Sequence, residues 1–302
     1  MKQYDVIIIG AGPAGLTAGI YALRGGLSAL IVERDAPGGQ ILKTHDIENF
    51  PGFENIAGYE LAIKMHEQTV KAGCEFMYDE VETVDLTGGV KRLKLKSGEE
   101  AASNNVIIAT GAKPMLLNVK GEAEFTGRGV SYCATCDGNF YRGKTVVTVG
   151  GGNTAVYDAL FLSNIVNKVY VVHRRKEFRA EKVLVDALRG KDNVEFVLDS
   201  VIDEIYGENK VDSVRIKSVI DGSEQRIFTD GVFIAIGQKP QSELFMDVAK
   251  DEHGFIITDT DMKTSVNGVY AIGDVRSTDL RQIVTACADG AVAASAIIKN
   301  RA

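Results

Sequence analysis

The chain has 302 residues, of which 45% are hydrophobic and 25% charged, and it carries a formal net charge of −7 at pH 7. A chain of this length and apolar content suggests about two domains, each able to bury a core. The negative charge, without a long basic tract, argues against a nucleic-acid partner. The first residues lead directly into an expected strand, so no signal peptide is indicated, and we expect a cytoplasmic protein that binds no membrane.

The first expected elements are a buried strand from Tyr4 to Ile9 and an apolar helix that continues through Leu23. A dinucleotide-binding fingerprint of the form GxGxxG joins them. Its first glycine permits a tight turn, its second lets the backbone approach a pyrophosphate, and its third allows helix and strand to pack closely. The N-terminus of the helix offers N–H groups to phosphate. The turn consists of Gly10, Ala11, Gly12, Pro13, Ala14 and Gly15.

Glu33 ends the next expected strand, which starts at Ala29. A carboxylate at this point of the fingerprint can accept hydrogen bonds from a ribose 2′-OH. The turn and Glu33 together predict a first nucleotide site.

A second unit repeats the plan, with an expected strand from Thr145 to Val149 and a helical run from Val156 to Leu162. At the spacing where the first unit has Glu33, the second has His173, followed by three arginines. Donors that bind a 2′-phosphate thus replace a carboxylate that would repel one, which predicts NADP rather than NAD. A solvated surface face is the alternative interpretation of this basic run. The second site comprises Gly150, Gly152, Asn153, Thr154, Ala155, His173, Arg174, Arg175 and Arg179.

The repeat extends to the segments that close each unit, 106–114 and 232–240. A further strand ending in Gly273-Asp274, and a helix from about Arg281 to Lys299, belong to neither repeat and are expected to complete the first unit. The sequence therefore predicts an α/β fold with two Rossmann-like dinucleotide-binding domains, the second inserted into the first through crossings near 112–116 and 240–245. The expected domains are 1–114 with 244–302, and 115–243.

Cys133 and Cys136 form a CxxC motif inside the second unit, and Asp137 follows directly. In a reducing compartment a CxxC is redox-active or half of a metal site. No second CxxC or HxxxH pair is present to complete a zinc site, so we expect no metal. Asp137 has two interpretations, as a proton donor in thiol chemistry or as a cap for the following turn. The two other cysteines, Cys74 and Cys287, are expected to be ordinary buried residues.

These motifs, in this order and spacing, resemble the low-molecular-weight thioredoxin reductase family over essentially the whole chain. The resemblance is strengthened by Gly38-Gly39-Gln40, Glu48 to Gly52, and Gly273-Asp274 followed by Arg281-Gln282. It implies a homodimeric flavoprotein that binds FAD in the first domain and NADPH in the inserted one. It also implies FAD contacts, beyond the first turn and Glu33, at Arg34, Gly39, Gln40, Asn49, Ala109, Thr110, Gly111, Gly273, Asp274, Arg281 and Gln282.

The family's reaction, as the resemblance implies it, passes hydride from NADPH to FAD, two electrons on to the Cys133–Cys136 disulfide, and finally reduces thioredoxin by thiol–disulfide exchange. The inserted domain would rotate between two orientations, with the crossings as its hinge. We expect Cys136 to be the sulfur nearer the flavin and Cys133 its exchange partner; which of them attacks thioredoxin stays open.

Three alternatives remain. The electron donor could be ferredoxin or another carrier in place of NADPH, although relatives of that kind tend to lose the basic triplet and the glycine fingerprint. The partner could be a glutaredoxin-like or peroxiredoxin-associated protein. The chain could also be a non-catalytic flavin redox sensor, which predicts no steady turnover with any disulfide protein.

Overall fold

The computed structural model describes residues 2–44 and 46–301 and divides them into two compact units. The second unit, Pro114–Gln238, interrupts the first, which runs up to Lys113 and resumes at Lys239. The predicted insertion of one α/β domain into another is confirmed. The second crossing falls between Gln238 and Lys239, whereas the sequence places it near 240–245. At the crossings β7 (Ala112–Pro114) pairs with β16 (Gln238–Pro240) in a two-stranded sheet.

The first unit is built on a seven-stranded sheet in the order β3-β2-β1-β6-β5-β4, with β17 paired to β6. Strands β3, β2, β1, β6 and β17 run parallel, and β5 and β4 continue the sheet antiparallel. The strands are β1 (Gln3–Ile9), β2 (Ala29–Glu33), β3 (Glu75–Tyr78), β4 (Val81–Asp85), β5 (Lys91–Leu95), β6 (Glu100–Ile108) and β17 (Val269–Ala271).

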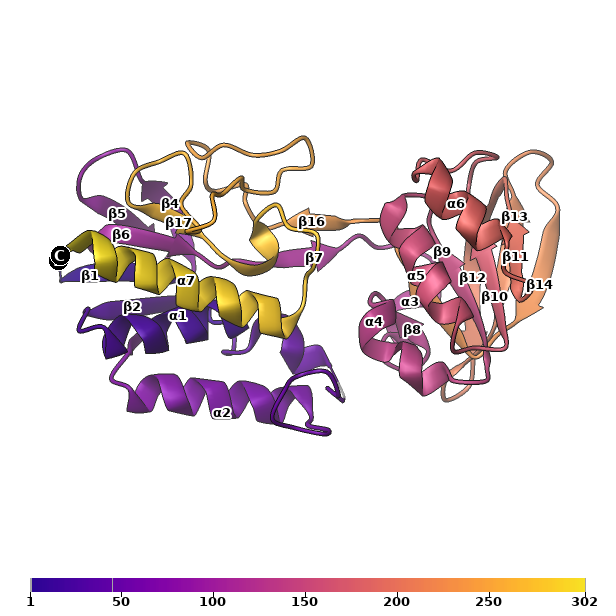
Figure 1. Ribbon diagram of the computed structural model, residues 1–302, viewed down its shortest axis with the longest axis horizontal. Coiled ribbons are helices and arrows are strands. Elements are labelled where there is room, and N and C mark those ends of the chain that lie inside the picture. Colours follow the sequence, from indigo (N-terminus) through magenta and orange to yellow (C-terminus); the bar gives the residue numbers. More distant parts are fainter. Residues whose placement is uncertain (1, 45, 302) are drawn as a thin grey trace. The chain divides into compact units, whose positions relative to one another are not determined.

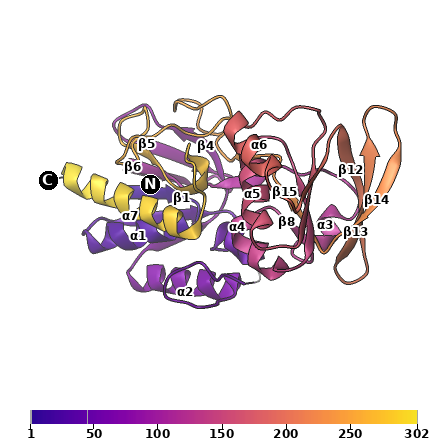
Figure 2. The same ribbon diagram turned by 45° about the vertical axis from the view of Figure 1, so that its right-hand side comes forward.

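Three α-helices of this unit gather on one face of the sheet, where α7 lies along α1 (Figures 1 and 2). They bury one apolar cluster against the sheet, and the 241–268 segment contributes to a second cluster on the other face. The helices are α1 (Pro13–Arg24), α2 (Gly58–Lys71) and α7 (Ile283–Arg301), with 3₁₀ turns η1 (Gly39–Lys43) and η3 (Gly273–Val275). The last helix begins two residues later than the sequence suggests.

Helix α7 is long and apolar enough to cross a membrane, the one such helix among the described residues. One of its faces packs into the unit, and the other is exposed. A Cβ on Gly290 would meet the backbone oxygen of Ala14 at 2.3 Å, so α7 and α1 pack closely. The neighbouring Asp289 is buried and accepts a hydrogen bond from the N–H of Gly273 in the η3 turn. A buried, ion-paired carboxylate is typical of a protein interior and not of a lipid-facing surface.

The second unit carries a parallel sheet in the order β11-β10-β9-β15-β8 and a separate antiparallel sheet, β12-β13-β14. The parallel strands are short apolar runs, as expected for strands covered on both faces. They are β8 (Val130–Ser131), β9 (Thr145–Val149), β10 (Lys168–Val172), β11 (Val194–Val197) and β15 (Gly231–Ile234). The antiparallel strands are β12 (Ser200–Gly207), β13 (Val211–Ser218) and β14 (Glu224–Phe228). The helices are α3 (Glu122–Phe125), α4 (Ala134–Asp137), α5 (Asn153–Ser163) and α6 (Lys182–Arg189), with the 3₁₀ turn η2 (Gly138–Tyr141).

Candidate nucleotide and disulfide sites

The first glycine turn joins β1 to α1, and its glycines serve different needs. Gly10 has φ +110°, and a Cβ there would lie 2.5 Å from the backbone oxygen of Ala109. A Cβ on Gly15 would lie 2.0 Å from the oxygen of Gly10. The protein itself therefore requires these two glycines. A Cβ on Gly12 would meet no protein atom within 4 Å, so the open space beside it is what a close-approaching phosphate needs.

Glu33 lies beside this turn at the end of β2. Its Oε2 accepts a hydrogen bond of 2.7 Å from the N–H of Ala11, and its Oε1 accepts one of 2.8 Å from Asp35. Each carboxylate oxygen has a second lone pair, which leaves room for a ribose hydroxyl. Arg34, the next residue, is engaged in exposed ion pairs with Asp35 and Glu80.

Several residues expected at the first site are brought together from distant parts of the chain. A Cβ on Gly39 would lie 3.3 Å from the Cα of Gly12, so Gly39 sits against the glycine turn. Nδ2 of Asn49 donates a 3.0 Å hydrogen bond to Oε1 of Gln282. The other side-chain bonds join Gln40 Nε2 to the oxygen of Ala112 at 2.8 Å, and Thr110 Oγ1 to the oxygen of Gln241 at 2.6 Å. Gly111 follows with φ +69°.

The η3 turn presents Asp274, whose carboxyl has no hydrogen-bond partner among the described residues. Burial raises its pKa, and the nearby charge of Arg281 partly opposes this. Arg281 stacks over the ring of Phe255 at 4.2 Å, and its Nε is buried with no hydrogen-bond partner in the described chain. An unpartnered acceptor and an unpartnered donor in one half-buried corner fit a polar ligand that would satisfy both.

Two residues that sequence reasoning missed hold this turn in place. The guanidinium of Arg276 forms a bidentate pair with the carboxylate of Asp289: Nε donates to Oδ2 at 2.6 Å and Nη2 donates to Oδ1 at 2.9 Å. Asp289 Oδ2 also accepts the N–H of Gly273 at 3.0 Å. This ion pair joins η3 to the middle of α7, and no local sequence motif predicts it.

The second glycine turn, between β9 and α5, repeats the first in its backbone requirements. Gly150 has φ +148°, and a Cβ there would lie 2.4 Å from the oxygen of Ala235 and 2.7 Å from the Cβ of Ala155. A Cβ on Gly152 would again meet no protein atom within 4 Å. Thr154 is exposed in the first turn of α5. The space beside Gly152 thus matches the space beside Gly12.

His173 lies beneath this turn and does not reach solvent. It is 5% exposed, and a Cβ on Gly151 would fall 2.1 Å from its ring. The ring stacks on Phe178, with centroids 5.1 Å apart, and Nε2 lies 3.2 Å from the carbonyl oxygen of Glu177. Burial lowers the pKa of His173, which the neighbouring arginines lower further. A neutral imidazole supports the turn from below.

The basic loop that follows His173 is tied to the turn. The N–H groups of Arg179 and Ala180 both donate to the oxygen of Gly151, at 2.8 and 3.2 Å. Asn153 and Glu181 bond each other twice, Asn153 Nδ2 to Glu181 Oε1 at 3.1 Å and Glu181 N to Asn153 Oδ1 at 2.9 Å. The guanidinium groups of Arg174, Arg175 and Arg179 are exposed and form no ion pair within the described ranges.

Cys133 and Cys136 are joined by a disulfide across α4, with their Cα atoms 5.3 Å apart. The Sγ of Cys133 accepts a hydrogen bond from the N–H of Cys136 at 3.2 Å and lies 3.4 Å from Thr135 Oγ1. Burial raises the pKa of the other two thiols, to about 12 for Cys74, as expected for structural cysteines. Among the residues placed in the structure, no group of three or more His, Cys, Asp and Glu side chains lies close enough to hold a metal ion.

Asp137 ends α4, and its carboxyl is turned into the protein. Ser131 Oγ donates a 2.6 Å hydrogen bond to Asp137 Oδ2, and the same Oγ accepts the N–H of Cys133 at 3.1 Å. Burial raises the pKa of Asp137, and the hydroxyl of Ser131 opposes this rise. Ser131 is a third residue that the sequence did not single out, because one serine before a CxxC carries no signal.

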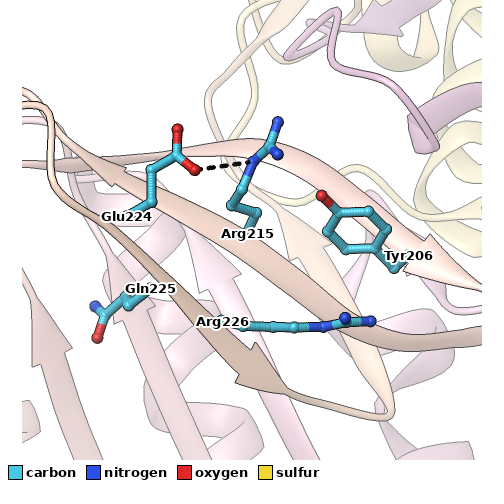
Figure 3. A pocket seen from close by; sticks show the side chains of 5 residues that line it. All are labelled: Tyr206, Arg215, Glu224, Gln225 and Arg226. Carbon is cyan, nitrogen blue, oxygen red and sulfur yellow. Dashed lines mark ion pairs between the residues drawn. The ribbon is translucent and has the colours of Figure 1, made fainter.

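A separate hollow on the antiparallel sheet of the second unit has a different character. It is lined by Tyr206, Arg215, Glu224, Gln225 and Arg226 (Figure 3). Its arginines are paired with acids: Arg215 with Asp203 and Glu224, and Arg226 with Asp212. These are ion pairs between neighbouring strands at the surface, and we interpret them as stabilising the sheet.

Comparison with known proteins identifies the family. A model of the pyridine nucleotide-disulphide oxidoreductases matches residues 4–290. The chain belongs to this family. It is similar to the thioredoxin reductase of Bacillus subtilis, with 45% identity over 98% of this chain and 94% of that protein.

Solved structures of other family members are similar throughout the chain. A thioredoxin reductase from Streptococcus pyogenes matches with a TM-score of 0.92 and 46% identity over 98% of this chain and 97% of that one. One from Giardia duodenalis matches with a TM-score of 0.93 and 37% identity over the same shares. The α/β fold with two dinucleotide-binding domains is therefore confirmed for this member of the family.

Proposed function

We propose that the protein is an NADPH-dependent thioredoxin-disulfide reductase. The observation that carries the proposal is the Cys133–Cys136 disulfide, placed in the same unit as a glycine turn and an unpaired arginine cluster. The relatives named thioredoxin reductase, similar over nearly their whole length, support the same function. The family supports the assignment of Cys133 and Cys136 as the redox-active pair.

FAD is the group proposed for the first unit, residues 1–114 and 244–302 in the sequence-based division. The open space beside Gly12 suits its pyrophosphate, and Glu33 suits its ribose. The half-buried polar groups of Asp274 and Arg281 suit its polar chain. When bound, FAD would supply a two-electron carrier between a nicotinamide and a disulfide.

NADPH is the proposed donor for the inserted unit, residues 115–243. Gly152 leaves space for a pyrophosphate, and Arg174, Arg175 and Arg179 present free guanidinium groups for a 2′-phosphate. His173 contributes by supporting Gly151 from below. The glycine turn and the arginines together favour NADPH over a protein donor such as ferredoxin.

The chain's own residues then carry the exchange. One thiolate of the reduced pair attacks a sulfur of the thioredoxin disulfide and forms a mixed disulfide, and the released thioredoxin sulfur takes a proton. The second cysteine attacks the mixed disulfide, re-forms the Cys133–Cys136 bond and frees the other thioredoxin sulfur. Asp137 is proposed as the proton donor, since its burial keeps a proton on the carboxyl to higher pH than usual. The paired crossings, β7 and β16, are proposed as the hinge of a rotating domain.

A homodimer, which the family resemblance implies, and a cytoplasmic location are part of the proposal. Glutaredoxin-like or peroxiredoxin-associated partners remain second candidates, because they present the same disulfide chemistry.

An anaerobic titration with NADPH tests the proposal, with flavin absorbance and free thiols followed together. The expected result is bleaching of the flavin and two new thiols per chain, one from each cysteine of the disulfide. Steady NADPH oxidation should follow when oxidised thioredoxin is added. The C133S and C136S variants should keep flavin bleaching and lose thioredoxin turnover. Bleaching by reduced ferredoxin but not by NADPH, or turnover by C136S, would contradict the proposal.

A further inference from the structure

The hydroxyl of Ser131 connects the two ends of the disulfide segment. Ser131 ends β8, is 5% exposed, and its Oγ lies 2.6 Å from Asp137 Oδ2 and 3.1 Å from the N–H of Cys133. Oγ also lies 3.3 Å from the carbonyl oxygen of Cys133, but a hydroxyl has one proton to give. The shorter contact to a carboxylate takes that proton. Ser131 therefore donates to the acid and accepts from the backbone of the first cysteine.

We propose that Ser131 is a positioning residue for disulfide exchange, which fixes the Asp137 carboxyl relative to the Cys133 backbone so that a proton can be delivered to the departing sulfur. This inference rests on the proposed reductase function, with Asp137 as its proton donor, and adds the residue that holds the donor in place. Ser131 touches neither sulfur nor cofactor in this role and acts through Asp137.

Ser131 is the sole hydrogen-bond partner of the Asp137 carboxyl within the described part of the chain. No basic side chain pairs with Asp137 there. The ionisable group that interacts with it is Tyr141, whose pKa rises to about 12 through burial and the charges of Asp137 and Asp230. Asp158 lies on α5, the helix packed against α4. Burial disfavours a negative charge on Asp137, and the Ser131 hydroxyl is the group that stabilises its ionised form.

The test compares S131T with S131V. These side chains have the same shape and differ in the hydroxyl, so the steric cost of the extra methyl groups in a buried site is shared. S131A removes the hydroxyl without adding volume. It replaces S131V in the comparison if the larger side chains disturb the fold. Thermal unfolding and flavin absorbance establish that each variant is folded and loaded.

The first measurement is the pH profile of thioredoxin reduction. S131A and S131V should lower the maximal rate about tenfold, a part of what a positioned proton donor contributes. Their alkaline limb should move to higher pH, because a carboxyl without its hydrogen-bond donor keeps its proton longer. S131T should retain the wild-type profile. In a D137N background the serine substitutions should have no further effect, since they act through the missing acid.

The second measurement needs neither partner nor turnover. Iodoacetamide alkylation of the reduced protein, followed against pH, reports the thiolates of Cys133 and Cys136. With Asp137 held neutral to higher pH, alkylation in S131A and S131V should begin at lower pH than in wild type and S131T. Equal profiles for S131T and S131V, or a hydroxyl effect that persists in D137N, would overturn the proposal. Failure of the wild type to reduce thioredoxin would instead reject the reductase function, while the alkylation profiles would still decide the role of Ser131.

Discussion

Asn49 and Gln282 are joined by a 3.0 Å hydrogen bond from Nδ2 to Oε1, although 233 residues separate them along the chain. One lies in the segment after η1 and the other directly before α7. Both were expected from the family resemblance to contact FAD, and the structure makes them neighbours in the same unit. Their bond ties the loop after η1 to the start of α7 on the side where the cofactor is proposed.

The first prediction concerns this pair. N49A and Q282A should each raise the dissociation constant of FAD about tenfold, because each removes a contact proposed for FAD and also breaks the hydrogen bond that positions the other side chain. The double variant should lose less than the sum of the two, as residues in one hydrogen-bonded pair are coupled. Fluorescence of flavin released on dilution measures the affinity. Full additivity would show that the two amides act independently.

The second prediction separates glycines required by the fold from those required by the ligand. G12A and G152A add a Cβ that meets no protein atom within 4 Å, so unfolding of the cofactor-free protein should change by less than about 0.5 kcal/mol. G12A should nevertheless lose FAD, and G152A should raise the KM for NADPH more than about tenfold, because the methyl fills the space of a phosphate.

G15A is the matched control for G12A. Its Cβ would lie 2.0 Å from a backbone oxygen, so it should destabilise the cofactor-free protein by about 3 kcal/mol or more. Chemical denaturation without FAD distinguishes the two classes. Unperturbed FAD binding by G12A would place the pyrophosphate elsewhere.

The third prediction tests the arginine loop. Replacing Arg174, Arg175 and Arg179 by alanine should raise the KM for NADPH by about tenfold to a hundredfold, since charge-assisted bonds to phosphate contribute about 1.5–3 kcal/mol. The KM for NADH should hardly change, because NADH lacks the 2′-phosphate. N153A is a companion variant: it breaks the two bonds to Glu181 that hold the loop, and should weaken both nucleotides. Equal losses for NADPH and NADH in the triple variant would argue against recognition of a 2′-phosphate.

The fold was predictable because its signals are local. Gly10 and Gly150 adopt φ of +110° and +148° between a buried strand and a helix. This backbone conformation favours glycine, so the glycines in the sequence indicate it directly. The CxxC could be assigned to redox chemistry because the sequence has no second CxxC or HxxxH pair to complete a zinc site. The insertion followed from the last strand and helix, which belong to neither repeat and were expected to complete the first unit.

The side-chain partners were not predictable, because they depend on contacts across the fold. Asp289 lies in the middle of an apolar helix, and its pairing with Arg276 becomes visible when α7 packs on α1. His173 occupies the position where a ribose contact was expected, yet packing turns its ring under Gly151. Whether it also contacts a nucleotide stays a prediction, as do the individual cofactor contacts.

The fourth prediction concerns the buried ion pair. D289N leaves Arg276 without its carboxylate in a site where the two side chains are 18% and 9% exposed, and should destabilise the first unit by about 3 kcal/mol. It should also weaken FAD binding, because Asp289 fixes the N–H of Gly273 beside Asp274. Urea unfolding of the cofactor-free protein and FAD affinity measure the two effects.

R301A serves as the control for this ion pair. It breaks the more exposed pair between Arg301 and Asp5, at 3.4 Å, and should cost less than about 1 kcal/mol. Similar losses in R301A and D289N would mean that burial adds nothing to the Arg276 pair.

The fifth prediction is a pH dependence of stability centred on Asp158. Burial on α5 raises the pKa of this carboxyl from 3.8 to about 7, and no side chain among the described residues compensates it. Between these two values the folded protein binds a proton that the unfolded chain has released, so the free energy of unfolding falls as the pH rises through this window. Above it, the folded state carries a buried charge. D158N should remove this dependence and stabilise the protein at about pH 8 by up to about 4 kcal/mol, the equivalent of the shift. Urea unfolding of wild type and D158N at about pH 5 and about pH 8 tests this, because the gain should be about 4 kcal/mol at the higher pH and only about 1.5 kcal/mol at the lower one. If D158N changes the free energy of unfolding equally at both pH values, the Asp158 carboxyl is hydrated in the folded protein and has its ordinary pKa there.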